Sequence, residues 1–354
     1  MQNKLKVGVL GATGTVGQRF VQLLEHHPWF EVGELAASDR STGRSYEEAC
    51  QWKISGRMPK YAAPMIVKDC SANLACDFVV SGLPSSVAGE VESAFAEKGY
   101  PVLSNSKNHR MDEDVPLLVP EINAEHLALL KVQKRNRGYK GGFIITNPNC
   151  TTMALVLALA PLRRSFQLET VTVVSMQALS GAGYPGVASM DIIDNVVPYI
   201  EGEEEKVEIE PLKIFGKHCD GRIEFAKMRI SAQCHRVNVS DGHLEAVSVG
   251  FASRPEESEV RAALTNYRSL PQELELPSAP RRPVVLVEGS DRPQPRLDRE
   301  IENGMATVVG RLRPCPVLDY KFDLLGHNTI RGAAGAAILN AELLLKQGLL
   351  ESRN

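Results

Sequence analysis

Glycines in the spacing GxxGxxG, placed directly after a short apolar run, constrain this chain more than any other feature. The apolar run covers residues 6–10 (KVGVL), the glycine segment covers 11–17, and a helical pattern follows over 17–25. Glycines between a strand and a helix allow a tight turn and let main-chain N–H groups approach a pyrophosphate at the helix N-terminus. The spacing departs from strict GxGxxG, yet its place near the N-terminus predicts a dinucleotide site rather than a turn that only packs a helix. The cofactor-binding residues expected in this segment are Gly11, Thr13, Gly14, Thr15, Val16 and Gly17.

The rest of the N-terminal part alternates short apolar runs with helical stretches. Strands are predicted over 6–10, 30–36, 77–81, 102–104 and 143–146, and helices over 17–25 and 87–97. This alternation is typical of parallel βαβ units with helices on both faces of the sheet. We therefore predict an α/β fold that begins with a Rossmann-type, doubly wound parallel sheet.

Beyond Cys150 the pattern changes. An apolar helix over 151–162 precedes longer strands over 170–177, 228–239, 245–252 and 305–312. Several of them alternate apolar and polar residues, which is typical of an antiparallel sheet with one covered face. The Pro- and Arg-rich segment 277–295 is expected to be an exposed connection, and 332–346 an amphipathic helix. A chain of 354 residues is too long to fold around one compact core. A second, mixed α+β domain is therefore predicted to follow the Rossmann-type one.

Charge, hydropathy and cysteine usage exclude several classes of protein. Lys plus Arg number 40 and Asp plus Glu 43, so the net charge of −3 gives no reason to expect a nucleic acid or an anionic membrane as partner. No run approaches the roughly 18 apolar residues that span a bilayer, and the N-terminus does not resemble a signal peptide. The seven cysteines form no CxxC pair and no zinc-ligand spacing. These features predict a soluble cytoplasmic protein without disulfides or a metal.

The loop after the second predicted strand bears on the choice between NAD and NADP. It offers Ser38, Arg40, Ser41 and Arg44 beside Asp39. Hydroxyl and guanidinium donors suit a 2′-phosphate, whereas an NAD site usually offers an acidic residue to the ribose diol. We therefore predict NADP, with a solvated polar loop as the alternative.

Cys150 and His243 are candidates for catalysis. Cys150 follows an apolar strand and begins an apolar helix, where the helix dipole is expected to lower the pKa of its thiol. Asn149 and the main-chain N–H of Cys150 are expected to hold an oxyanion. A lone cysteine is usually structural, and His243, in a polar Asp-Gly-His turn, would by itself be an exposed imidazole. The histidines expected at the surface are His26, His27, His126 and His218.

Six segments along the chain together point to a family. They are GATGTVG at 11–17, SNSKNHRM at 104–111, NPNCTT at 147–152, QALSGAGYPG at 177–186, CHRVNVSDGH at 234–243 and HNTIRGAAGAA at 327–337. In this order and spacing they resemble aspartate-β-semialdehyde dehydrogenase, in the branch found in archaea and fungi. The resemblance runs over essentially the whole chain.

The resemblance implies reductive dephosphorylation of L-aspartyl-4-phosphate by NADPH, giving L-aspartate 4-semialdehyde and phosphate for lysine, threonine and methionine biosynthesis. It implies that Cys150 is the nucleophile that forms a thioester and that His243 is the acid/base. By the same resemblance, Gln177 orients the acyl group and Arg236 pairs with the substrate α-carboxylate. Such chemistry needs one thiolate, one proton carrier, an oxyanion site and cations for a phosphate dianion.

Further roles also follow from the resemblance alone. Glu203 and Lys206 match the pair that contacts the substrate amine and phosphate, and the choice among Glu203, Glu204 and Glu205 stays open. Arg110 matches a phosphate-binding arginine. The remaining cofactor contacts implied are Gly82, Ser180, Gly181, Gly183 and Asn328, the last near the nicotinamide carboxamide.

The predicted organisation places the NADP-binding domain at 1–147, completed by a C-terminal helix within 328–354. Residues 148–327 are predicted to form the catalytic and dimerisation domain of a homodimer or tetramer. Two alternatives remain open: a malonyl-CoA reductase of the same fold, whose substrate has no amine, and a non-catalytic NADP-sensing protein that needs no reactive cysteine.

Overall fold

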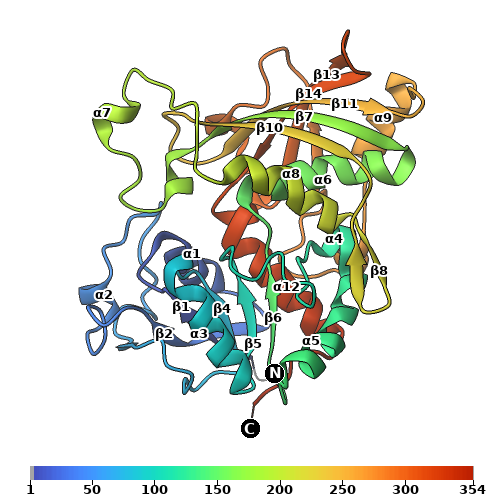
Figure 1. The fold of residues 1–354 in the computed structure, drawn as a ribbon. Coiled ribbons are helices and arrows are strands. Elements are labelled where there is room, and N and C mark those ends of the chain that lie inside the picture. The colour runs from blue at the N-terminus through green and yellow to red at the C-terminus, as the bar shows by residue number, and fades with distance from the viewer. Residues whose placement is uncertain (1–3, 354) are drawn as a thin grey trace.

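Two six-stranded β-sheets organise the computed structural model, which describes residues 4–353 (Figure 1). The first sheet has the order β3-β2-β1-β4-β5-β6, and all of its strand pairs are parallel. Its strands are β1 (Leu5–Leu10), β2 (Phe30–Ala36), β3 (Val67–Lys68), β4 (Phe78–Ser81), β5 (Pro101–Ser104) and β6 (Phe143–Thr146). The strand order reverses between β1 and β4, and a reversal of this kind leaves a crevice at the carboxyl ends of the strands.

Helices cover both faces of this sheet. On one face, Val7 of β1 shares an apolar cluster with Phe20 of α1 (Thr15–Leu24) and Ile338 of α12 (Gly335–Lys346). On the other face, Val79 of β4 packs in a separate cluster with Phe95 of α3 (Ser85–Glu97). The predicted doubly wound Rossmann-type sheet is thereby confirmed.

The second sheet has the order β10-β7-β11-β14-β13-β12, and it is mixed rather than antiparallel. Its strands are β7 (Leu168–Gln177), β10 (Arg229–Arg236), β11 (His243–Phe251), β12 (Val284–Val287), β13 (Thr307–Pro314) and β14 (Tyr320–Gly326). The pairs β10–β7 and β12–β13 are parallel, and the other three are antiparallel. An antiparallel sheet was therefore the wrong expectation at both edges. Period-two alternation reports a covered face but not a direction, and the crossover through α8 (Glu203–Ile214) brings β10 back parallel to β7.

The segment 277–295 is not wholly an exposed connection, as its composition had indicated. Val284 and Val285 are buried in β12, which adds to the edge of the second sheet. Four consecutive apolar residues suffice for an edge strand even when prolines stand on both sides. Proline and arginine content outweighed this short run in the sequence-based prediction.

Two histidines expected at the surface are buried. His27 lies 2.7 Å from Glu342 through Nε2, and its Nδ1 accepts main-chain N–H groups of Trp29 and Phe30. His126 Nε2 lies 3.0 Å from the carbonyl oxygen of Gly216. Both rings are buried because hydrogen bonds satisfy their polar atoms, which no local sequence pattern reveals.

The other elements connect the two sheets or lie along their edges. The longer ones are α5 (Leu129–Arg137), α6 (Cys150–Ser165), α9 (Glu257–Thr265), and the hairpin of β8 (Lys217–Cys219) and β9 (Arg222–Glu224). The short helices are α2 (Tyr46–Ala49), α4 (Pro120–Asn123), α7 (Ser189–Ile192), α10 (Leu270–Glu273) and α11 (Pro295–Asp298). The single turns are η1 (Ala124–Ala128), η2 (Leu179–Ala182), η3 (Ile301–Gly304) and the π-type η4 (Ile330–Ala334).

The C-terminal helix α12 lies against the first sheet, although it follows the last strand of the second (Figure 1). Leu339 and Leu343 of α12 share a cluster with Val9 of β1. The division at residues 147 and 148 stays a prediction. Across residues 4–353, none of the helices is both long and apolar enough to cross a membrane.

Candidate active site

Cys150 stands where the two sheets meet, at the first residue of α6. Strand β6 ends at Thr146, and Asn149 caps the helix by accepting the N–H groups of Thr151 at 2.9 Å and Thr152 at 3.3 Å. The side-chain oxygen of Asn149 thus satisfies two of the unpaired donors at the start of a helix. This cap fixes the direction in which Cys150 leaves the loop.

His243 lies beside the sulfur of Cys150. Its Nε2 is 3.2 Å from Cys150 Sγ, and its Nδ1 accepts the main-chain N–H of Ala178 at 3.0 Å. The neighbouring Arg236 donates from its guanidinium to the carbonyl oxygen of Ala178 at 2.7 Å. Strands β7 and β10 end, and strand β11 begins, at the same end of the second sheet. This explains how three segments distant in the sequence meet here.

The pKa of the Cys150 thiol is raised to about 12, because burial disfavours the thiolate and the carboxylate of Glu203 adds to the effect. Arg110, Arg236 and the main-chain N–H of Thr151 act in the opposite direction. The lowered pKa that the helix N-terminus predicted is therefore wrong, since the loss of hydration outweighs the effect of the cations.

Helix α8 carries charged side chains toward the loop that holds Cys150. Glu203 is buried and accepts from Asn149 Nδ2 at 2.8 Å and from Lys206 Nζ at 2.8 Å. Glu204 instead accepts the main-chain N–H of Cys234, and Glu205 is exposed. This arrangement supports Glu203 among the three glutamates. The Asn149 amide is engaged with Glu203, so its role toward an oxyanion stays a prediction.

Glu210 and Lys213, on the next turns of α8, are contacts that the sequence analysis missed. Glu210 is buried and accepts from the main-chain N–H of Asn149 at 2.6 Å and from Arg110 at 2.9 Å. The amine of Lys213 donates to three carbonyl oxygens of the loop that carries Arg110, those of residues 110, 112 and 115. Burial lowers the pKa of Lys213 to about 8. Helix α8 therefore joins the loop of Arg110 to the loop of Cys150.

Three more predicted site residues lie near this end of the second sheet: Gln177, Ser180 and Asn328. Gln177 is buried at the end of β7 and donates to Ser175 at 3.2 Å. Asn328 donates to the Ser180 hydroxyl at 2.8 Å and accepts the N–H of Gly242 at 2.9 Å. The structure thus brings together two residues predicted to contact the cofactor, Ser180 and Asn328.

The glycine segment after β1 fits a dinucleotide. Gly11 has a φ of +75°, and a Cβ on Gly17 would lie only 2.2 Å from the Gly11 oxygen. No side chain caps α1 and its first turn contains no acidic residue, so its N-terminal N–H groups remain available to a pyrophosphate. A Cβ on Gly82, which follows β4 at the switch point, would press on Val16 at 3.2 Å.

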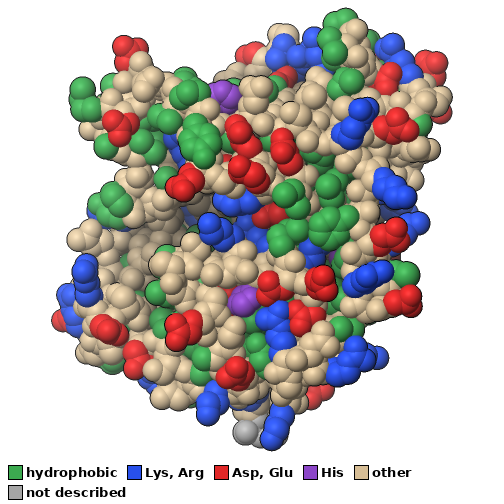
Figure 2. Space-filling view, in the orientation of Figure 1, with side chains coloured by type: hydrophobic (Ala, Val, Ile, Leu, Met, Phe, Trp, Pro, Cys, Tyr) green, Lys and Arg blue, Asp and Glu red, His purple; other side chains and the backbone are tan. Residues whose placement is uncertain are grey.

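The loop after β2 places its donors at the surface. Ser38 and Arg40 are exposed, Arg44 is exposed and donates to the carbonyl oxygen of Glu48, and Ser41 is buried with its N–H on the Ser38 oxygen. Figure 2 shows a hollow between the parts of the molecule that carry the two sheets, with Lys and Arg side chains beside it. The exposed donors leave room for a 2′-phosphate.

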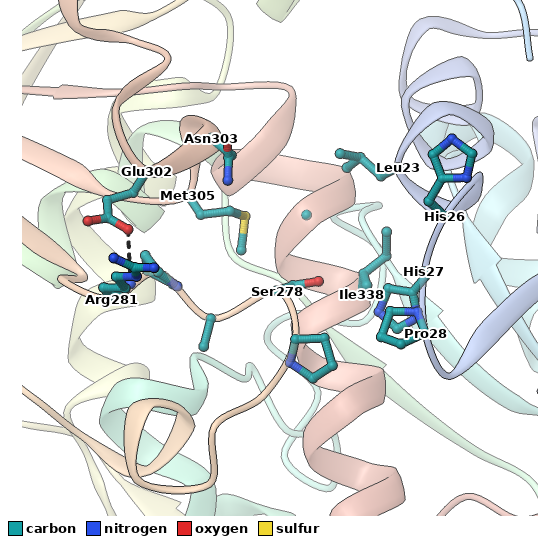
Figure 3. A pocket seen from close by; sticks show the side chains of 14 residues that line it. Leu23, His26, His27, Pro28, Ser278, Arg281, Glu302, Asn303, Met305 and Ile338 are labelled. Atoms are coloured by element: carbon teal, nitrogen blue, oxygen red, sulfur yellow. Dashed lines mark hydrogen bonds between the residues drawn. The ribbon is translucent and has the colours of Figure 1, made fainter. Parts of the chain in front are cut away.

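A separate pocket of about 450 Å³ lies between the end of α1 and α12 (Figure 3). Leu23, Met305 and Ile338 line it, and Glu302 accepts the main-chain N–H of Arg281 at 3.0 Å. It contains none of the predicted site residues. Within residues 4–353, no group of three or more His, Cys, Asp or Glu side chains is arranged to hold a metal ion.

Gly332 is expected to be intolerant of a side chain, because a Cβ there would lie 2.7 Å from the Cβ of Cys150. The change Gly332→Ala should therefore displace the nucleophile and lower turnover about tenfold or more. Gly141→Ala is the matched control, since its nearest contact would be an ordinary 3.7 Å. Turnover and the rate of thiol alkylation measure the effect; equal values in both variants would contradict it.

The chain is similar to known proteins over nearly its whole length. The family model described as "Semialdehyde dehydrogenase, NAD binding domain" matches residues 6–130, and "Semialdehyde dehydrogenase, dimerisation domain" matches 159–331. The chain is 53% identical to the aspartate-semialdehyde dehydrogenase of Archaeoglobus fulgidus, over 98% of this chain and 100% of that protein. It is 50% identical to the Schizosaccharomyces pombe enzyme of the same name, over 98% and 99%. The crystal structure of the Candida albicans aspartate-semialdehyde dehydrogenase with NADP superposes with a TM-score of 0.90 at 43% identity, covering 98% of this chain and all of that one.

Proposed function

Since the chain belongs to the aspartate-semialdehyde dehydrogenase family, we propose that Cys150 and His243 form its catalytic centre. The activity is NADPH-dependent reductive dephosphorylation of L-aspartyl-4-phosphate to L-aspartate 4-semialdehyde, a step of amino-acid biosynthesis. The distance of 3.2 Å between Cys150 Sγ and His243 Nε2 carries the proposal, because two residues 93 positions apart in the sequence meet at the N-terminus of helix α6. NADPH, when bound, supplies the hydride that reduces the thioester.

Cys150 is the residue that forms the thioester. Its sulfur attacks the acyl carbon of the substrate, and phosphate leaves as the carbon–oxygen bond breaks. After reduction, the carbon–sulfur bond of a hemithioacetal breaks and releases the aldehyde. His243 acts on the oxygen and sulfur atoms of these steps, because its Nε2 is the nearest ring atom to the nucleophile.

The charged residues around the pair bind the two ends of the substrate. Arg236 takes the α-carboxylate, and Glu203 with Lys206 takes the amine and the phosphate. Arg110 serves the phosphate, and Glu210 beside it restrains its guanidinium. Gln177 orients the acyl group, with Asn149 and the main-chain N–H of Cys150 at the oxyanion. What supports these roles is a set of contacts: Glu203 accepts from Asn149 and Lys206, Glu210 accepts from Arg110, and Arg236 and His243 both bond to the main chain of Ala178.

The cofactor contacts fall into two groups. Gly11, Thr13, Gly14, Thr15, Val16, Gly17 and Gly82 would hold the pyrophosphate, with Ser38, Arg40 and Ser41 at the 2′-phosphate, and Ser180, Gly181, Gly183 and Asn328 at the nicotinamide. The domain boundaries at 147 and 327 belong to the same proposal. So do a homodimer or tetramer, supported by the dimerisation-domain match, small-molecule substrates rather than nucleic acid or membrane, and a cytoplasmic location.

The comparisons do not favour a malonyl-CoA reductase or a non-catalytic NADP-sensing protein. A steady-state assay separates these from the proposal. With aspartate semialdehyde and NADP, reduction of NADP should require phosphate or arsenate and should not proceed with coenzyme A in their place. Reduction of malonyl-CoA by NADPH, or no turnover with any of these substrates, would contradict the proposed function.

NADP should be preferred to NAD, because Arg40 and Arg44 stand beside Ser38 in the loop after β2. An arginine contact to a phosphate is worth about 1.5–3 kcal/mol, or roughly one to two powers of ten in affinity. Arg40→Ala should therefore lower kcat/KM for NADP by about that factor and leave kcat/KM for NAD unchanged. Arg57→Ala, in another exposed loop, is the control. Equal kinetics of the wild-type enzyme with both nucleotides would reject the role of this loop.

A further inference from the structure

One face of the second sheet is covered by helix α6. Val173 of β7 and Val247 of β11 share an apolar cluster with Ala158 of that helix. Because successive side chains of a strand point to opposite faces, residues two positions away from these valines face α6 as well. Ser175 and Glu245 are such residues, so polar side chains follow the apolar ones on the same covered face.

Two rows of buried side chains form the end of this face that lies nearest the candidate site. The site row consists of Arg236, Gln177 and His243, and the inner row consists of Cys234, Ser175 and Glu245. In an antiparallel pair such as Ser175 and Glu245, the Cβ atoms are about 4.5–5.5 Å apart. The inner row is therefore the layer directly behind the residues proposed for the site.

Glu245 is buried in an unusual way. Its side chain has no exposed surface, and neither carboxyl oxygen accepts a hydrogen bond from any donor within residues 4–353. Burying an ionised carboxylate without a partner is far more costly than burying its protonated form. Burial accordingly raises the pKa of Glu245 well above its ordinary value. These observations favour a neutral carboxylic acid, which has a hydrogen to donate.

Gln177 has an acceptor that lacks a donor. Its Oε1 is buried without a hydrogen-bond partner, while its Nε2 donates to Ser175 Oγ at 3.2 Å. This bond turns the amide of Gln177 back along β7 toward Ser175, the residue that faces Glu245. Two unpartnered acceptors beside the same serine are both satisfied when one of them carries a proton.

The other site residues are already engaged. Nε2 of His243 lies 3.2 Å from the sulfur at the start of α6, and its Nδ1 accepts the main-chain N–H of Ala178. Arg236 donates to the carbonyl oxygen of Ala178. Within the two rows, Oε1 of Gln177 is the acceptor other than Glu245 that has no donor.

We propose that Glu245 is a neutral acid that donates a hydrogen bond to Oε1 of Gln177 and thereby fixes the amide that orients the acyl group. With Oε1 bound to Glu245 and one hydrogen of Nε2 bound to Ser175, the second hydrogen of Nε2 remains for the substrate. Glu245 is a positioning residue, because it acts through Gln177 and loses no proton in the reaction. The inference deepens the proposed function and rests on it.

The protonation of Glu245 can be observed directly. The infrared spectrum of full-length Glu245→Gln at neutral pH is subtracted from that of the wild-type enzyme. Because the C=O bond of a carboxylic acid absorbs at a higher frequency than an ionised carboxylate, the difference should contain one carboxylic-acid band. A carboxylate band in its place would overturn the inference.

Two substitutions separate the donor from the charge. The amide of Glu245→Gln can donate as the acid does, whereas Glu245→Met fills a similar space and cannot donate. The Gln variant should keep wild-type kcat for aspartate semialdehyde, and the Met variant should lose about 3- to 10-fold, the worth of one hydrogen bond. The Met variant should unfold at no lower denaturant concentration, since it no longer buries an acid. Equal kcat values in the two variants would overturn the inference.

A double-mutant cycle tests whether Glu245 acts through Gln177. In a Gln177→Met background, Glu245→Met should cause no further loss of kcat, because the acceptor is already gone. A second loss equal to the first would overturn the inference.

Glu169→Met, at the exposed start of β7, is the matched control and should keep wild-type kinetics. A loss there equal to that of Glu245→Met would also overturn the inference. A wild-type enzyme that does not turn over aspartate semialdehyde with phosphate contradicts the proposed function instead. An active wild type with equal Gln and Met variants contradicts only the inference about Glu245.

Discussion

Cys150→Ser should lower kcat by about three to six powers of ten, as expected when the nucleophile of a covalent mechanism is lost. A serine hydroxyl is a far weaker nucleophile than a thiolate, and the position at the start of α6 does not compensate for it. NADP affinity should remain unchanged, because the glycine segment after β1 does not include Cys150. Stopped-flow turnover and a fluorescence titration with NADPH measure the two quantities.

The control is Cys219→Ser, because Cys219 is exposed in the β8–β9 hairpin and free. It should keep wild-type turnover. Substantial activity in Cys150→Ser, or an equal loss in Cys219→Ser, would show that Cys150 is not the nucleophile.

Arg236→Lys should raise the KM for aspartate semialdehyde by roughly 10- to 100-fold, the scale of losing one hydrogen bond to a charged group. Lysine keeps the charge but loses the planar fork, which pairs with a carboxylate through two parallel hydrogen bonds. The change also removes the contact that holds the Ala178 carbonyl oxygen. Steady-state kinetics with aspartate semialdehyde and with an aldehyde lacking the α-carboxylate measure the effect.

Arg229→Lys, at the exposed start of the same strand, is the matched control and should be neutral. In Arg236→Lys, the KM should rise much less for the aldehyde that lacks the carboxylate than for aspartate semialdehyde. Equal losses with both aldehydes would assign Arg236 to the structure of the site rather than to recognition of the carboxylate.

The Rossmann-type part could be predicted because its signals are local. A strand such as β6 is a continuous apolar run between polar segments, and the glycine turn marks where β1 gives way to α1. The second sheet was harder to predict, because the relative direction of two neighbouring strands depends on the connection between them. Strand β10 is parallel to β7 only because α8 crosses between them, and nothing within residues 229–236 carries that information.

The candidate site shows the same division. Motif residues such as Cys150 and His243 could be selected from the sequence, but their 3.2 Å contact depends on the fold. Glu210 and Lys213 were missed, although the charged residues of α8 recur on one helix face at Glu203, Lys206, Glu210 and Lys213. A stripe of charges at helical spacing usually marks a solvated face, whereas here it is largely buried. The prediction of a lowered pKa for Cys150 failed for a related reason. The start of a helix does not show how deeply its first side chain is buried.

Trapping the acyl-enzyme tests the account most directly. The enzyme is mixed with aspartate semialdehyde and NADP in the absence of phosphate, and the Cys150 peptide is analysed by mass spectrometry. The account predicts one NADPH formed per active site, an aspartyl thioester on Cys150, and loss of that adduct when phosphate is added. No adduct on Cys150, or an adduct that coenzyme A discharges and phosphate does not, would contradict it.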